Sequence, residues 1–327
     1  MRKKDRWIPE LAEQTEQKTG QSRRPDKAED RTDGIRRKEE DKMSSALVME
    51  GGAMRGLFTG GIIDVLLEKN ITFDMAVGVS AGATFGCNFK SKQKGRVLRY
   101  NLRFCKEPRY CSFRSLFLTG DLYGAKFCYE TLPFKLDPFD NDTFENNPMK
   151  FYCVATDVET GKPIYYLCKD AREKDLLWIR GSASMPCFAR PVQVDGKTLL
   201  DGGVSDSIPV QFALNQGYDK VVVILTQPEG YVKERSSLQG GIDLALRKYP
   251  KLVEAMDNRP QMYNDTLKLV KKLEQEGRIL AIRPPHKLPV GHIEHDPAKI
   301  REAYDIGREN GLAWADRISE YLGTSGK

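Results

Sequence analysis

Ser80 is the residue of this sequence whose surroundings best suit it for chemistry. It stands in a G-x-S-x-G pentapeptide between Gly78 and Gly82, after the mostly apolar run 71–79 and before small residues that begin a helix. A strand that turns tightly into a helix exposes a serine hydroxyl at the tip of the turn, and the glycines leave room for that turn. The pattern indicates a nucleophile for acyl transfer. The alternative is a serine that only caps the helix.

Asp201 is the second candidate. It is followed by Gly202 and Gly203 at the end of the apolar run 197–200. Asp-Gly is a common turn dipeptide, so a purely structural turn is the alternative interpretation. A serine nucleophile needs a partner that takes its proton, and a carboxylate can do so. Asp201 is therefore a candidate base for Ser80.

A histidine is the more usual base, and the sequence has three: His286, His292 and His295. They lie in one proline-rich and glycine-containing segment, and one of them could complete a triad in the order Ser, Asp, His that α/β-hydrolases use. That fold places its nucleophile after several strands, and too few residues precede Ser80 for this. We therefore expect loop histidines at the surface and favour a Ser80–Asp201 dyad.

A glycine-rich loop follows the apolar run 46–50 and contains Gly51, Gly52 and Ala53. Backbone N–H groups between a strand and a helix can bind an anion. A nucleotide phosphate is one possibility, but Ala53 breaks the dinucleotide signature and no P-loop lysine follows. An oxyanion hole, which stabilises the charge on a reacting carbonyl oxygen, is the better interpretation. Arg55 would order this loop or bind an acidic partner, or stand exposed on the helix.

Composition favours a soluble globular protein. The 327 residues are 30% charged and 40% hydrophobic, and the net charge of +6 is spread along the chain. Without a basic block, nucleic acid is not an expected partner, although contact with anionic lipid remains compatible with this charge. The sequence does not predict an oligomeric state.

The seven cysteines lie at irregular positions, mostly inside apolar runs, which is typical of reduced, buried thiols in the cytoplasm. No C-x-x-C pair occurs and the three histidines lie far from most cysteines, so a zinc site is not expected. The longest apolar runs, such as 221–225, are far shorter than the roughly 18 residues of a membrane span. These features predict a cytoplasmic protein with, at most, peripheral contact to a membrane.

Strands alternate with helices along most of the chain, which predicts an α/β fold with a mostly parallel sheet covered on both faces. Residues 1–44 are expected to be a disordered charged tail, 45–322 one domain with a C-terminal helical extension, and 323–327 a flexible end. The expected strands are 46–50, 71–79, 149–155, 162–167, 197–200, 220–225 and 278–283. The expected helices are 56–67, 94–104, 173–183, 208–214, 264–276 and 297–322.

The segment 110–134 is rich in aromatic residues and is predicted to be irregular. Its aromatic side chains could form a pocket for an acyl chain, a lip that faces a membrane, or simply part of the core.

Taken together, the motifs resemble those of the patatin-like phospholipases, in particular a bacterial branch of small esterases. The similarity extends from about residue 46 to 225. The residues that carry it are Gly51, Gly52, Ala53, Arg55 and Gly56; Gly78, Ser80 and Gly82; Ala183 to Pro186; Asp201, Gly202 and Gly203; and Ile208 with Pro209.

The resemblance implies a three-layer α/β/α fold and hydrolysis of acyl esters in lipids, without a metal or cofactor. Ser80 would form an acyl-enzyme, and Asp201 would activate first the serine and then water. Amides around Gly51, Gly52 and Ala53 would form the oxyanion hole. An acyltransferase, or an inactive member that binds a lipid or a partner, remains an alternative.

Ala53 departs from the family pattern, which usually has glycine there. If this position requires a positive φ, alanine costs on the order of 1 kcal/mol and can misdirect one amide. Loss of one such donor lowers the rate of an acyl transfer by roughly a hundredfold or more. Weak activity is therefore one expectation from the sequence.

Overall fold

The computed structural model describes residues 44–236 and 239–323. The chain from Met43 onward clusters as one compact unit. The predicted tail lies outside the described residues except for Ser44, and so does the predicted flexible end except for Gly323.

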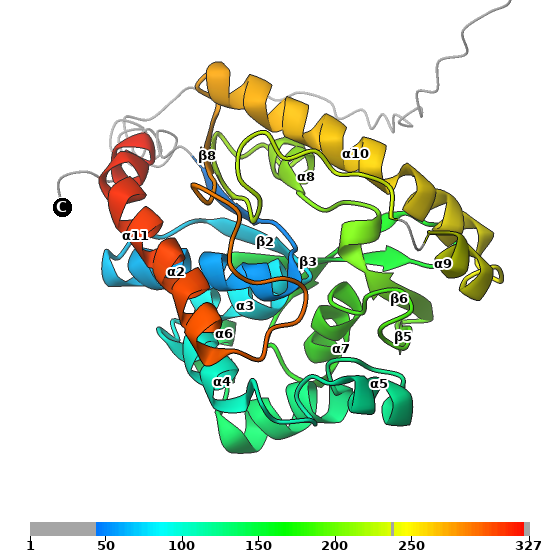
Figure 1. Cartoon of the computed structure of the whole chain (residues 1–327). Coiled ribbons are helices and arrows are strands. Elements are labelled where there is room, and N and C mark those ends of the chain that lie inside the picture. The colour runs from blue at the N-terminus through cyan, green and yellow to red at the C-terminus, as the bar shows by residue number, and fades with distance from the viewer. Residues whose placement is uncertain (1–43, 237–238, 324–327) are drawn as a thin grey trace, which may run out of the picture. The chain divides into compact units, whose positions relative to one another are not determined.

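The described residues contain one eight-stranded sheet with helices on both faces (Figure 1). Its strands are β1 (Ser45–Met49), β2 (Met75–Val79), β3 (Lys150–Asp157), β4 (Pro163–Cys168), β5 (Val192–Val194), β6 (Lys197–Asp201), β7 (Lys220–Ile224) and β8 (Ile279–Ile282). The α-helices are α2 (Gly56–Glu68), α3 (Ala81–Lys90), α4 (Arg96–Phe104), α5 (Phe113–Thr119), α6 (Asn141–Asn146), α7 (Glu173–Ser182), α8 (Val210–Asn215), α9 (Gln239–Ala245), α10 (Pro250–Gln275) and α11 (Pro297–Tyr321). Three short elements complete the set: the 3₁₀ turns η1 (Ala53–Arg55) and η3 (Gly202–Val204), and the π-helical segment η2 (Phe127–Leu136).

The sheet order is β5-β6-β3-β2-β1-β7-β8, and β4 pairs with the other edge of β3. The central strands β3, β2, β1, β7 and β8 are parallel, whereas β4, β5 and β6 join by antiparallel pairing. Since parallel strands are buried on both faces, they read as continuous apolar runs. The predicted mostly parallel sheet is confirmed.

Successive side chains of the central strands point to opposite faces, and each face has its own helical layer. Leu47 and Met49 of β1 belong to the core beneath α2, α3, α4, α7 and α11. Ala46 and Val48 belong to the core beneath α8 and α10. Figure 1 shows α8 and α10 together on one side of the sheet and α2, α3, α4 and α11 on the other. The predicted three-layer α/β/α arrangement is therefore confirmed.

Strands β2 and β6 meet end to end along the same edge of β3. Val79, the last residue of β2, pairs with Val154, and Asp201, the last residue of β6, pairs with the next residue, Ala155. Strand β4 occupies the opposite edge at the same positions. This register brings the residue after β2, Ser80, to the end of β6.

The observed elements differ from the predicted ones in several places. Strand β2 begins at Met75 and not at residue 71, and β5, α6 and α9 were not predicted. Helix α10 begins at Pro250, well before the predicted start at residue 264, and contains Pro260. A proline in a helix normally ends it, so the sequence pattern predicted only a part after Pro260. The segment 110–134 is less irregular than predicted, because α5 and the first part of η2 lie within it.

Candidate active site

The turn from β2 into α3 holds Ser80 in a rare backbone conformation. Its φ is 53° and its ψ is −116°, which few non-glycine residues adopt outside strained functional turns. A Cβ added at Gly78 would lie 2.1 Å from the Gly82 carbonyl oxygen, and one at Gly82 would lie 2.3 Å from that of Met49. Only glycine fits at either position. The N–H group of Ser80 donates to Ser182 Oγ at 3.0 Å.

The Ser80 hydroxyl lies against the Asp201 carboxylate. Ser80 Oγ donates to Asp201 Oδ2 at 2.7 Å, and Gly203 N–H donates to Asp201 Oδ1 at 2.8 Å. The two residues are 8% and 6% exposed, respectively. Both oxygens of the carboxylate are thus oriented, with one directed at the hydroxyl. The sequence prediction that these residues lie together agrees with the structure; their catalytic roles stay a prediction.

Burial raises the pKa of Asp201 above the ordinary aspartate value. The hydrogen bond from Ser80, the charge of Arg259, the Gly203 amide and the charge of Lys233 act in the opposite direction and favour the carboxylate. A carboxylate with a raised pKa is a stronger base than a solvated one. The environment therefore suits Asp201 to accept a proton, and the two nearby cations limit the rise in its pKa.

The glycine-rich loop after β1 lies beside the serine. A Cβ added at Gly51 would lie 3.2 Å from Ser80 Cβ. The N–H group of Gly51 donates to the Ser207 carbonyl at 3.4 Å, whereas the N–H groups of Gly52 and Ala53 have no protein acceptor in the described residues. Of the three predicted oxyanion donors, these last two are thus available for a ligand.

Ala53 has a φ of 49°, in the left-handed region that favours glycine. Position 53 therefore does require a positive φ, the condition under which the sequence analysis expected a strained alanine. In this conformation Ala53 begins the 3₁₀ turn η1, and no acceptor in the described part of the chain bonds to its amide.

The remaining motif residues shape the surroundings of the dyad. Gly56 begins α2, where a Cβ would lie 2.7 Å from that of Ala81. Gly202 approaches the Val154 carbonyl so closely that a Cβ would lie 2.0 Å from its oxygen. These contacts let α2 approach α3, and let the turn after β6 lie on β3.

The structure agrees with neither the acidic partner nor the exposed helix position proposed for Arg55, while a role in ordering the loop stays a prediction. Arg55 is half-buried and not on an exposed helix face, and no carboxylate in the described part of the chain lies within ion-pair distance of it. Its Nε atom is buried without a hydrogen-bond partner. Arg55 instead lines a cavity next to Ser80.

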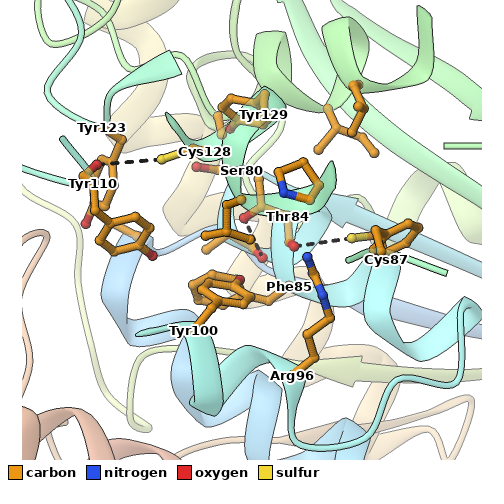
Figure 2. A pocket seen from close by; sticks show the side chains of 18 of the residues that line it. Ser80, Thr84, Phe85, Cys87, Arg96, Tyr100, Tyr110, Tyr123, Cys128 and Tyr129 are labelled. Carbon is orange, nitrogen blue, oxygen red and sulfur yellow. Dashed lines mark hydrogen bonds between the residues drawn. The ribbon is translucent and has the colours of Figure 1, made fainter. Parts of the chain in front are cut away.

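Two cavities meet at Ser80, and Ala53 and Met185 also line both. The first, of about 140 Å³, is mostly apolar and aromatic. Figure 2 shows this cavity with Tyr110 and Tyr123 on one side of Ser80 and Cys87 on the other. The predicted aromatic segment thus contributes to a pocket.

The second cavity, of about 490 Å³, has a mixed lining and contains both members of the dyad; we call it the polar cavity because of the charged side chains in its wall. Glu50, Arg55, Lys233, Arg259, Tyr263 and His292 are among its lining residues. Lys233, Arg259 and Tyr263 were missed from the sequence, because no motif marks them. The available signal was weak: Arg259 and Tyr263 are four residues apart and share one face of α10.

The histidines lie in the loop before α11, and all three are exposed. His295 Nδ1 lies 2.6 Å from the Cys105 carbonyl oxygen, and His292 lines the polar cavity. Within the described ranges no ring nitrogen of a histidine bonds to Ser80 or Asp201. The geometry favours the dyad over the triad.

The described residues offer neither a metal site nor a membrane-spanning helix. Residues 44–236 and 239–323 contain no group of three or more side chains that could hold a metal ion. No helix in the same ranges combines the length and apolar character needed to cross a bilayer. The seven cysteines are free, and five of them are buried.

Comparison with known families gives two matches. The family model described as patatin-like phospholipase matches residues 47–214. A second model, described as a domain of unknown function (DUF6363), matches residues 249–323. The boundary between them falls after α8, so the dyad lies in the first match, and Arg259, Tyr263 and His292 lie in the second.

Among individual proteins, the protein YjjU of Escherichia coli (strain K12), described as uncharacterized, is 30% identical over 291 residues, which cover 85% of this chain and 78% of YjjU. Lysophospholipase NTE1 of Candida glabrata is 22% identical, over 84% of this chain but only 16% of its own length. The chain thus spans less than a fifth of that relative. The crystal structure of VipD from Legionella pneumophila has a TM-score of 0.42 and 13% identity over 85% of this chain and 67% of that chain, too distant a likeness to inform function.

Proposed function

This chain belongs to the patatin-like phospholipase family, and from that premise we propose that it is a serine lipid acyl hydrolase that works through a Ser80–Asp201 dyad. The observation that carries the proposal is the 2.7 Å hydrogen bond from Ser80 Oγ to Asp201 Oδ2, at a strained strand-to-helix turn. The two cavities that meet at Ser80 support an amphiphilic substrate, with the ester bond at the junction.

In the first half of the reaction, Ser80 Oγ attacks the ester carbonyl carbon while its proton passes to Asp201 Oδ2. The amides of Gly52 and Ala53 stabilise the negative charge on the former carbonyl oxygen. As the tetrahedral intermediate collapses, the bond to the alcohol breaks and the alcohol oxygen takes the proton from Asp201. An acyl group then remains on Ser80.

In the second half, water replaces the alcohol. Asp201 accepts a proton from the water as its oxygen attacks the acyl carbon, and it returns that proton to Ser80 Oγ as the acyl bond breaks. The products are a carboxylic acid and the free enzyme. An alcohol acceptor in place of water would make the same intermediate transfer its acyl group, which is the acyltransferase alternative.

The test is to replace each dyad residue. Ser80→Ala and Asp201→Asn should each lower hydrolysis of an acyl ester by a factor of about 10⁴, because the parts of such a unit are not independent. Only the wild type and Asp206→Asn should label with a fluorophosphonate at a normal rate. Asp206 is a matched control: it is a half-buried carboxylate, five residues from Asp201, that accepts from Tyr165 instead of Ser80.

Full activity in the Ser80→Ala variant would contradict the proposal. Absence of activity in the wild type as well as the variants would favour the alternative of an inactive binding protein. A mutant that lacks all three histidines separates the dyad from the triad. The dyad requires near-normal turnover from it.

We also propose peripheral contact with a membrane through α5 and η2. Four apolar side chains are exposed there: Phe113, Phe117, Leu118 and Phe134, of which Phe117 is 90% exposed. Phe113 also lines the polar cavity, so this surface adjoins the site. Phe117→Ser should reduce cosedimentation with anionic vesicles several-fold, whereas Leu312→Ser, an exposed apolar change on α11, should not. Equal vesicle binding by both variants would contradict the contact.

A further inference from the structure

Three cations from separate segments converge on the polar cavity. Arg55 comes from η1, Lys233 from the loop after β7, and Arg259 from α10. All three are half-buried, and the cavity wall that they share also contains Ser80. Positive charge is thus gathered in the wall of the cavity that also contains the Ser80 hydroxyl.

These cations are not neutralised by ion pairs. In residues 44–236 and 239–323 no carboxylate lies within ion-pair distance of Arg55, Lys233 or Arg259. Elsewhere on the chain, exposed lysines such as Lys251 do have such partners. The cavity therefore differs from the ordinary charged surface of this protein.

The buried carboxylates in the same wall are already satisfied by other donors. Glu50 accepts from Tyr263 Oη at 2.6 Å and from the Thr226 amide at 2.5 Å. Asp201 accepts from Ser80 and from the Gly203 amide. The remaining acid of the wall, Glu234, is exposed. Hydrogen-bond donors of the three cations are therefore available to a ligand.

The cations are held in place by the fold. The Lys233 amide donates to Asn264 Oδ1 at 2.8 Å, and Asn264 Nδ2 donates back to the Lys233 carbonyl at 3.0 Å, which fixes the loop on α10. Lys233 Nζ lies 4.9 Å from the centre of the Tyr263 ring. Arg259 Nε donates to the Gly203 carbonyl at 2.6 Å, so this bond leaves its terminal nitrogens free to bind a ligand.

The electrostatics agree with this arrangement. Burial, followed by repulsion from Arg259, lowers the pKa of Lys233 to about 8, although Glu50 and Asp201 oppose the shift. Although His292 is partly exposed to solvent, desolvation of its ring in the cavity, together with the charges of the three cations, lowers its pKa to about 4, so the ring is neutral near pH 7. An anion bound among these side chains would relieve their mutual repulsion.

We propose that Arg55, Lys233 and Arg259 form a subsite for the phosphate of the substrate's head group. Guanidinium and ammonium donors from three directions suit the several oxygens of a tetrahedral anion. The phosphate of a lysophospholipid is separated from its ester by only a few bonds. With the acyl chain in the apolar cavity and the ester at Ser80, the phosphate would therefore lie in the polar cavity. Lys233 and Arg259 lie outside the patatin match, so the C-terminal segments would set head-group selectivity. This inference rests on the proposed hydrolase function.

The first experiment compares two substrates with the same acyl chain: lysophosphatidylglycerol, which bears a phosphate, and monoacylglycerol, which does not. The wild type should prefer the first in kcat/KM, and Lys233→Gln should reduce this preference about tenfold or more, mainly through KM. Lys251→Gln is the control, because it removes the same charge from an exposed position on α10. An unchanged preference in Lys233→Gln with normal thermal stability would overturn the subsite.

The second experiment measures binding without turnover. In the Ser80→Ala background, titration calorimetry should show that glycerol 3-phosphate binds, that glycerol does not, and that Lys233→Gln weakens the binding about tenfold or more. No difference between the two ligands would overturn the proposal. Equal binding of inorganic phosphate, without a preference for the phosphate-bearing lipid, would overturn the head-group assignment and indicate a site for free phosphate.

These measurements separate two failures. If the wild type hydrolyses neither lipid, or if Ser80→Ala hydrolyses both, the proposed hydrolase function fails. The calorimetric comparison still tests the subsite in that case, because it requires no reaction.

Discussion

The two cavities that meet at Ser80 differ in how the chain builds them. The apolar cavity is lined only by residues between Ala53 and Met185, all within the patatin match. The polar cavity is lined by residues from Glu50 to Ile293 and takes its cations from both sides of the boundary of that match. Both cavities contain Ser80. The acyl chain would contact only the patatin-matched part of the sequence, whereas the head group would also contact residues beyond it. Changes in each part should therefore alter selectivity for one half of the substrate only.

The largest effect is expected from a change in the turn that holds Ser80, because the reaction needs this serine whichever cavity binds which part of the substrate. Gly78→Ala would put a Cβ 2.1 Å from the Gly82 carbonyl oxygen inside the turn, so the turn cannot keep its shape. We expect loss of fluorophosphonate labelling and a strong decrease in the melting temperature. Gly240→Ala is the control, because a Cβ there meets nothing within 4 Å. A stable and active Gly78→Ala protein would mean that the elbow is not constrained as described.

The next change concerns the apolar cavity alone. Cys87 lines it from α3, two turns after Ser80, and burial raises the pKa of its thiol to about 12, so it stays protonated and acts as a small apolar group. Cys87→Leu should fill part of the cavity and reduce the ratio of long-chain to short-chain ester hydrolysis about tenfold. Hydrolysis of an ester series with rising chain length measures this ratio. An unchanged ratio would place the acyl chain elsewhere.

A smaller effect is expected from pH on the polar cavity alone. Lys233 is charged below its pKa of about 8 and neutral above it, so preference for the phosphate-bearing lipid should be full near neutral pH and decline as pH rises through that value. Arg55, Arg259, Glu50 and Asp201 also face this lysine, and their charges act on its pKa. We expect a decrease of about three- to tenfold in the lysophosphatidylglycerol preference, because one charge-assisted hydrogen bond weakens.

Lysophosphatidylglycerol is suitable for this measurement because its phosphodiester keeps one charge throughout. Lys233→Arg is the control for the assignment: its side chain stays charged, so the preference should no longer depend on pH. A persistent decline in Lys233→Arg would assign the titration to another group.

The sequence could predict the parts of the site that local backbone geometry determines. Ser80, Gly78 and Gly82 lie within five residues, and the steric demands of one tight turn determine their types, so the pattern was visible without a structure. Asp201 is distant in sequence, yet it also ends a strand and precedes two glycines. The parallel sheet followed likewise from apolar runs such as 220–225.

The polar cavity could not be predicted in this way. Lys233 and Arg259 act through side chains brought together by the packing of α10 on the sheet, and no local backbone requirement fixes their neighbours. Because Pro260 suggested the end of a helix, the first half of α10, which carries Arg259, was not predicted. Charged residues on a helix are common, so only the three-dimensional arrangement distinguishes these from solvated ones.

The smallest effect is expected at Ala53, which lines both cavities and departs from the family's glycine. Its left-handed conformation costs roughly 1–2 kcal/mol, which Ala53→Gly would relieve. Glycine also adds about 0.4–1 kcal/mol of entropy to the unfolded chain, so the unfolding free energy should change by less than about 1 kcal/mol. Since no acceptor among the described residues bonds to the Ala53 amide in this conformation, kcat should change less than about threefold. Denaturant unfolding and ester hydrolysis measure the two quantities. A tenfold increase in kcat would instead show that alanine misdirects this donor and that the junction, not either cavity, limits the enzyme.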